Sequence, residues 1–197
     1  MESISVSVRQ REKLETNRRL LDSAQQLFGT NGISESRTAD IATLAGVAHG
    51  TLFLHFPQKD DLIVAVISRY GERVTRALHD LVEAGASLKG VLEAHLRTLA
   101  DDEVFYMRLV LEGPSIPVRA RNAFLGIQSA IAWHLAAALR REMASGRVKE
   151  MRLDLLFNTW VGVVHHYVVN RDLFAPGAEV LIERMDELVN HFLNLIS

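Results

Sequence analysis

The sequence predicts an all-α protein in which an N-terminal three-helix domain is joined by a long fourth helix to a helical bundle. Two observations lead to this fold class. Apolar residues recur at intervals of three and four along most of the chain, as in amphipathic helices, and not at the interval of two that marks strands. Glycine and proline residues fall between these periodic segments, where they end helices.

Three helices are expected before the long fourth one. The first covers residues 14–29 and is ended by Asn31-Gly32, and residues 1–12 are expected to form a frayed arm. A short helix over residues 38–45 is broken by Gly46, and another over residues 49–56 is stopped by Pro57. These three helices define the first domain, residues 1–58.

The rest of the chain, residues 59–197, is predicted to be a second helical domain. Its first helix runs from residue 59 to about residue 83 and reaches a weak boundary at Ala84-Gly85-Ala86, so it should join the two domains rigidly. Five further helices are predicted at residues 88–100, 103–112, 118–144, 152–170 and 178–196.

The composition excludes several kinds of site. The chain has no cysteine, which excludes disulfides, thiol catalysis and cysteine-ligated zinc. We find no nucleophile-and-base signature, no phosphate loop and no acids at catalytic spacing, so we expect no catalytic residues, no cofactor and no enzyme activity. His165 and His166 are neighbours on a predicted helix and point about 100° apart, so no metal site is expected.

Charge and hydropathy predict the compartment of the protein and limit how it could bind nucleic acid. The N-terminal residues lack the apolar run of a signal peptide, and the most apolar stretches, residues 130–139 and 160–169, are too short to span a bilayer. We therefore expect a soluble, cytoplasmic protein that does not bind membranes. The net charge of -2 provides no broad basic surface, so any nucleic-acid binding must depend on a few placed groups.

The stretch from Thr38 to Phe56 carries the most functional information. It contains two short helices joined by a turn with a glycine, the pattern of a helix-turn-helix. The second helix of such a pair enters the major groove of DNA by its N-terminal end. Helical spacing places its polar and small residues, with Phe53 and Leu54, on the face opposite Leu52 and Phe56. The alternative is a packed three-helix domain that has Phe53 and Leu54 in its core.

Residues 19–62 resemble the N-terminal domain of the TetR-type transcriptional regulators. The matching elements are Leu27-Phe28 with Gly32, Thr38 with Ile41-Ala42, Ala45-Gly46-Val47, Gly50-Thr51-Leu52, His55-Phe56, and Lys59 with Leu62. The resemblance covers about a quarter of the chain. It implies a sequence-specific DNA-binding regulator, a repressor that a small-molecule effector releases from DNA. It also implies that the C-terminal domain binds the effector and dimerises.

The candidate DNA contacts follow from the motif together with this resemblance. They are Arg37, Thr38, His49, Gly50, Thr51, Phe53, Leu54, His55 and Lys59. Four positions depart from the family pattern. Ala48 replaces a serine cap, a loss of roughly 0.5–2 kcal/mol of helix stability. Phe53 and Leu54 replace two phenols that usually touch phosphate, and Gln58 replaces another serine cap. We therefore expect an unusual operator or modest affinity, with Arg37 as a compensating phosphate contact.

The last two predicted helices, residues 152–170 and 178–196, carry wide apolar stripes. Such stripes can serve both the core of one protomer and a partner, so two copies would form a four-helix interface with two-fold symmetry. That symmetry would space two recognition helices ~34–36 Å apart on double-stranded DNA and would match a palindromic operator. The alternative is that both stripes are purely intramolecular core.

Aromatic and polar residues of the second domain suggest an effector site for an apolar or amphipathic molecule. The candidates are Phe105, Tyr106, Trp133, His134, Trp160 and His165, with Arg108 nearby in sequence. A different possibility is a regulator without a ligand that binds DNA or a partner protein. The occupancy of a cavity in this domain would separate the two hypotheses.

Overall fold

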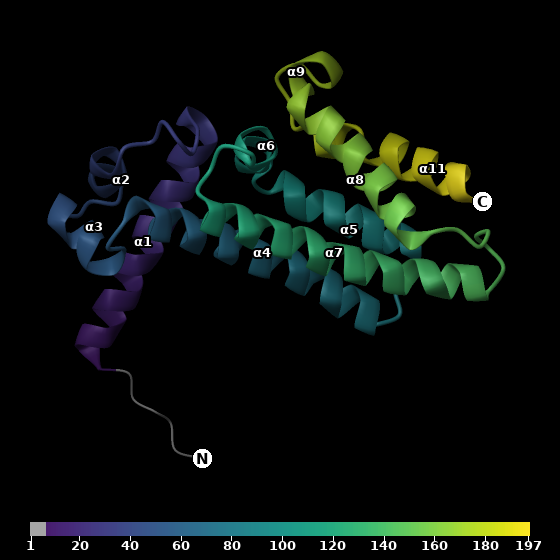
Figure 1. Ribbon diagram of the computed structural model, residues 1–197, viewed down its shortest axis with the longest axis horizontal. Helices are drawn as coiled ribbons and strands as arrows, with labels where there is room; N and C mark the ends of the chain where they lie inside the picture. Colours follow the sequence, from purple (N-terminus) through teal and green to yellow (C-terminus); the bar gives the residue numbers. More distant parts are fainter. Residues whose placement is uncertain (1–6) are drawn as a thin grey trace.

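The computed structural model describes residues 7–197, and every regular element in this range is a helix, which confirms the all-α prediction. Three helices form one end of the molecule, and α4 leads from them along the long axis into the bundle (Figure 1). The elements are α1 (Val8–Asn31), α2 (Thr38–Leu44), α3 (His49–His55), α4 (Lys59–Glu83), α5 (Leu88–Ala100), α6 (Glu103–Glu112), α7 (Val118–Ala144), α8 (Leu153–Val169), α9 (Arg171–Phe174), α10 (Val180–Glu183) and α11 (Met185–Ile196).

The first helix begins earlier than predicted. Ser7 Oγ accepts a hydrogen bond from the Gln10 amide at 3.3 Å, and the Gln10 side chain accepts one from the Ser7 amide at 3.0 Å. This reciprocal capping satisfies two amides that a helix start leaves unpaired, so α1 starts at Val8. The prediction of a frayed arm is therefore wrong for residues 8–12, and residues 1–6 lie outside the described part of the chain.

The end of the chain is also more divided than predicted. A short helix, α9, follows α8, and the single helix expected over residues 178–196 is split into α10 and α11 at Arg184. The Arg184 guanidinium donates to the Phe174 carbonyl at 2.8 and 3.0 Å. The break thus brings Arg184 onto the segment after α8, a contact between distant residues that helical periodicity does not reveal.

The bundle is built on the parallel course of α4 and α7, which lie side by side with α5 packed against both (Figure 1). Gly71 of α4 permits their close approach, because a Cβ atom there would lie 2.3 Å from Ile127 Cγ1 of α7. The helices α8 and α11 cover α5 from the other side. Buried apolar residues run continuously from α1 through α11 as one core.

One helix of the described chain, α7, is long and apolar enough to span a bilayer by length and composition alone. The prediction judged the stretches 130–139 and 160–169 too short to span a bilayer, but the first of them lies within this longer helix. Phe124, Ile131 and Leu135 of α7 are buried in the core. Core helices pass the same test, so this finding carries little weight.

Helix α6 holds the C-terminal end of α1 from two sides. The Arg108 guanidinium donates to the carbonyls of Gly29 at 3.1 Å and Thr30 at 3.3 Å. The Glu112 carboxylate accepts from the amides of Ile33 at 3.1 Å and Ser34 at 3.0 Å, just after α1 ends. Arg108 thus satisfies carbonyls that the end of α1 leaves unpaired, and Glu112 holds the loop that follows α1. A shift of α6 would therefore be transmitted to α1.

Candidate nucleic-acid interface and ligand cavities

The helices α2 and α3 form the predicted helix-turn-helix. Gly46 between them has φ +65°, a left-handed conformation that favours glycine. Ile41 and Leu52 are fully buried between the helices. An additional contact, which sequence reasoning missed, is the hydrogen bond from Arg19 Nη1 of α1 to the Ala45 carbonyl at 3.1 Å. The turn is therefore held against α1 by a charged hydrogen bond as well as by apolar packing.

The outer face of α3 is exposed, as helical spacing predicted. The side chains of Phe53 and Leu54 are 40% and 82% accessible, so the alternative that placed both in the core is wrong. Gly50 is also exposed, and a Cβ atom there would meet no other heavy atom within 4 Å. Two exposed apolar side chains beside a glycine with free space around it form an apolar patch, which is typical of a surface that binds a partner.

Two helices contribute to one polar contact on this face. Thr38 Oγ1 at the start of α2 lies 3.0 Å from His49 Nε2 at the start of α3. The His49 ring packs edge-on against Phe53, with 5.1 Å between ring centroids. These contacts fix the orientation of His49 and bring Thr38, His49 and Phe53 together on the surface.

The remaining predicted DNA contacts differ in their exposure to solvent and in the hydrogen bonds that they already form. Arg37 is exposed, while Thr51 and His55 are half-buried. Burial lowers the pKa of His55, so this side chain is a neutral hydrogen-bonding group at neutral pH. Lys59 Nζ donates to the Ser34 carbonyl at 2.7 Å, and burial lowers its pKa. Lys59 therefore holds the loop before α2, and a phosphate would have to compete with that carbonyl.

Sequence reasoning also missed a basic segment on the first turns of α1. Arg9, Arg11 and Lys13 are exposed there, because α1 extends to Val8. Besides burial, the charge of Lys13 contributes to the lowered pKa of His55 at the end of α3. The signal was present as three basic residues at spacing two, but the expectation of a frayed arm hid it.

The predicted effector residues do not all meet. Tyr106 Oη lies 2.8 Å from His165 Nε2, and Trp160 Nε1 donates to His95 Nδ1 at 3.0 Å, inside the bundle. Phe105 and Tyr106 both pack against the ring of Tyr70. His134 instead packs against His79 of α4, and Trp133 is 58% exposed with its ring against His134. The structure thus groups Phe105, Tyr106, Trp160 and His165, and leaves Trp133 and His134 on another face.

The buried His95 should make the fold sensitive to acid. Burial lowers the pKa of His95 from 6.5 to about 3. As pH falls below 6.5 the unfolded chain binds a proton that the folded chain does not, so stability is complete above pH 6.5 and decreases toward pH 3. We expect protonation of His95 in the unfolded chain to lower the unfolding free energy by about 2 kcal/mol between pH 6.5 and pH 5.

Urea unfolding of wild type and His95→Gln at several pH values checks this prediction. The glutamine keeps an acceptor for Trp160 but does not titrate, so its stability should depend less on pH in this window. An equal pH dependence in both proteins would contradict the assignment to His95.

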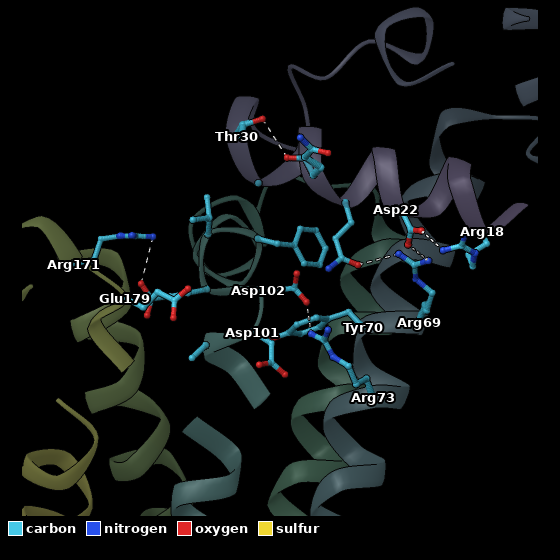
Figure 2. Close-up of a pocket in the computed structure, with 17 residues that line it drawn as sticks. Arg18, Asp22, Thr30, Arg69, Tyr70, Arg73, Asp101, Asp102, Arg171 and Glu179 are labelled. Atoms are coloured by element: carbon cyan, nitrogen blue, oxygen red, sulfur yellow. Dashed lines mark hydrogen bonds and ion pairs between the residues drawn. The ribbon is translucent and has the colours of Figure 1, made fainter. Parts of the chain in front are cut away.

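A separate cavity of about 840 Å³ lies where α1 meets α4 and the start of α6 (Figure 2). We call it the junction cavity. In Figure 2, Tyr70, Arg73, Asp101 and Asp102 lie together, with Arg18, Asp22 and Arg69 at one edge and Arg171 and Glu179 at the opposite edge. Of the predicted effector residues, Phe105 lines this cavity.

Comparisons with known proteins agree with the helix-turn-helix. Residues 20–66 match the sequence pattern of the family described as bacterial regulatory proteins, tetR family. A fatty acid metabolism regulator protein of Bacillus subtilis is 29% identical over 174 residues, which cover 82% of this chain and 90% of that protein. An HTH-type transcriptional repressor of Mycobacterium tuberculosis is 38% identical over 96 residues, which cover 46% of this chain and 50% of the repressor.

Solved structures share the whole fold. The transcriptional regulator FadR of Bacillus subtilis, in complex with stearoyl-CoA, superposes with a TM-score of 0.77 at 21% identity over 91% of this chain and 99% of that chain. The TetR family regulator PfmR of Thermus thermophilus superposes with a TM-score of 0.75 at 20% identity over 89% and 97% of the two chains. The helix-turn-helix and the match at residues 20–66 thus make this part of the chain similar to the DNA-binding domain of TetR-type transcriptional regulators, and the solved structures share its overall fold.

Proposed function

We propose that the protein is a cytoplasmic repressor that binds a palindromic operator as a homodimer and is released by a small molecule. The observation that carries this proposal is the outer face of α3, where Gly50, Phe53 and Leu54 are exposed on a helix-turn-helix. In this proposal, the first domain, residues 1–58, binds DNA, and the second domain, residues 59–197, binds the effector and dimerises.

The proposed DNA contacts combine apolar and polar groups. Phe53 and Leu54 would touch thymine methyl groups or deoxyribose, and Thr51 and His49 would donate to bases or phosphates. Arg37, together with the basic segment Arg9, Arg11 and Lys13, would contact phosphates. Thr38 would act mainly by orienting His49, with His55 and Lys59 as further phosphate contacts.

Replacing Arg37 by alanine should weaken binding to all duplexes alike, because a phosphate contact carries no sequence information. The slope of log affinity against log salt concentration should fall by about 1, since one fewer counterion is released. Fluorescence anisotropy with specific and random duplexes over a salt series measures both quantities. An unchanged slope, or a loss confined to one sequence, would remove Arg37 from the phosphate contacts.

Dimerisation is proposed through α8 and α11. Leu155 of α8 and Leu195 of α11 are exposed, although the other faces of both helices are buried in the core. The groove between the helices is lined by Gly162, Val163, His166, Tyr167, Glu187, Leu188 and His191. Packing these faces against a second copy would bury apolar surface that one protomer leaves in water.

A double change, Leu155→Glu with Leu195→Glu, should convert the dimer into a monomer, because it would bury charges without partners at the interface. Sedimentation velocity at micromolar concentration reports the state. Leu125→Glu, an exposed leucine on α7, is the matched control and should stay dimeric. A wild-type protein that sediments as a monomer would contradict the interface.

The effector is proposed to be apolar or amphipathic and to bind in the bundle near Tyr106, Trp160 and His165, whereas Phe105 lines the junction cavity. Two buried polar atoms in the bundle, His95 Nε2 and Gln128 Nε2, have no hydrogen-bond partner among residues 7–197, so a polar group of a ligand could satisfy them. The regulator FadR of Bacillus subtilis was solved with stearoyl-CoA, an amphipathic molecule. The contacts of Arg108 and Glu112 with the end of α1 supply a route from the bundle to the DNA-binding helices.

Native mass spectrometry of the purified protein, followed by operator binding with and without the molecule found, tests the effector proposal. A bound small molecule that lowers operator affinity would support it. A ligand-free protein whose operator affinity does not respond to amphipathic metabolites would favour a ligand-independent regulator.

A further inference from the structure

Two residues that line the junction cavity, Tyr70 and Glu103, each carry a buried side-chain oxygen atom without a hydrogen bond among the described residues. The side chain of Tyr70 is 2% exposed, and its hydroxyl has no partner within residues 7–197. Glu103 is also 2% exposed. Its Oε2 accepts from the Leu181 amide at 2.9 Å, but its Oε1 lies 3.3 Å from Arg171 Nη1 without a hydrogen bond. Arg171 thus compensates the charge on Glu103 Oε1, which leaves Tyr70 Oη as the buried oxygen without any partner in this part of the chain. Since buried oxygens are nearly always paired, Tyr70 Oη points to a ligand that donates a hydrogen bond.

The charges around the cavity favour a cation. Each arginine that lines it already has a carboxylate partner, so the arginines are not free to hold an anion. These ion pairs are Arg18 with Asp22, Arg69 with Asp22, Arg73 with Asp102, and Arg171 with Glu103. Asp101 and Glu179 also line the cavity, and neither forms an ion pair in the described part of the chain. Because Arg18 and Arg69 share Asp22, the lining holds four arginines and five carboxylates, and its net charge is -1.

Two aromatic rings add an apolar surface to these polar groups. Tyr70 and Phe105 both line the cavity and pack edge-to-face, with 5.4 Å between ring centroids. Burial raises the pKa of Tyr70 well above its usual value, so the hydroxyl stays neutral and can accept a hydrogen bond. The cavity volume of about 840 Å³ lies within the range of roughly 300–1,000 Å³ that small-molecule sites occupy.

We propose that the junction cavity binds an organic cation, a primary amine or guanidinium compound with an apolar body. An N–H group of the ligand donates to Tyr70 Oη, Asp101 and Glu179 attract its charge, and its body packs on Phe105. This site goes beyond the proposed function, because binding can be measured without DNA and without any effector in the bundle. Its walls belong to α1 as well as to α4 and α6, so an occupant would contact both halves of the molecule.

Isothermal titration of the full chain at neutral pH with three probes of one shape tests the charge preference. The probes are 4-phenylbutylamine, 4-phenylbutanol and 4-phenylbutanoate. We expect the amine to bind about tenfold or more tighter than the alcohol, since charge-assisted hydrogen bonds are worth roughly 1.5–3 kcal/mol, with the carboxylate weakest. Equal binding of amine and alcohol, tighter binding of the carboxylate, or no amine binding at millimolar concentration overturns the proposal.

Variants locate the probe. Tyr70→Phe removes a hydroxyl without a partner, so the ligand-free protein should melt at the same or a higher temperature while its affinity for the amine falls. Asp101→Asn and Glu179→Gln change exposed residues and should each weaken amine binding several-fold, whereas the control Asp186→Asn on α11 should not. Equal effects of Asp101→Asn and Asp186→Asn overturn the site. Weakening by His165→Phe but not by Asp101→Asn would place the amine inside the bundle and overturn it as well.

Discussion

Replacing Gly50 by glutamate should abolish operator binding and leave the fold intact. Gly50 is exposed near the start of α3, and a side chain there meets nothing in the free protein. Glycine is about 1 kcal/mol less favourable than alanine in a helix, so the substitution should not lower stability and could raise it. A glutamate facing phosphates costs several kcal/mol, so we expect operator affinity to fall roughly a hundredfold or more.

The control for this substitution is Gly126→Glu on α7. Gly126 is likewise an exposed helical glycine with open space around it, and the substitution adds the same charge. Operator affinity from anisotropy titrations and melting temperature from circular dichroism would be measured for both variants. If Gly50→Glu binds the operator as well as Gly126→Glu does, α3 does not lie against DNA.

The largest loss of stability is expected from Trp160→Ala. Trp160 is fully buried, packs against Phe192 with 5.2 Å between ring centroids, and donates to His95 Nδ1. Its removal leaves a large cavity and deprives the buried His95 of its hydrogen-bond donor. Large-to-small changes of this kind cost about 3–5 kcal/mol, so the unfolding free energy in urea should drop by that amount.

Trp133→Ala is the matched control, because it removes the same side chain from an exposed position. Exposed substitutions usually change stability by no more than about 0.5 kcal/mol. Both variants would be unfolded at the same protein concentration, since dimerisation contributes to apparent stability. Similar losses of unfolding free energy in the two variants would contradict the prediction that the buried Trp160 stabilises the core.

The bounds of the helices could be predicted where glycine and proline residues separate the periodic segments. The bounds of α4, α5, α6 and α7 agree with the prediction because Pro57, Gly85 and Gly113-Pro114 stop the periodic segments at defined points. The start of α1 is also encoded locally, since Ser7 and Gln10 have the spacing of a capping box. The break at Arg184 was not predictable, because it depends on a contact with Phe174.

The surface of the recognition helix followed from spacing, whereas contacts between helices did not. Helical periodicity placed Phe53 and Leu54 outside, and both are exposed. The contact of Thr38 with His49 and the bond of Arg19 to the turn join separate elements, so no local pattern reveals them. The two tryptophans illustrate the same limit. Both occupy apolar helical segments, and only the packed structure separates the buried Trp160 from the exposed Trp133.

Selection of bound duplexes from a random pool tests most directly the claim that α3 reads DNA as part of a dimer. The wild-type protein should enrich a palindrome whose half-sites are about one helical turn, or a multiple of it, apart, and Gly50→Glu should enrich nothing under the same conditions. Enrichment of no sequence by the wild type, or of the same sequence by Gly50→Glu, would contradict the account.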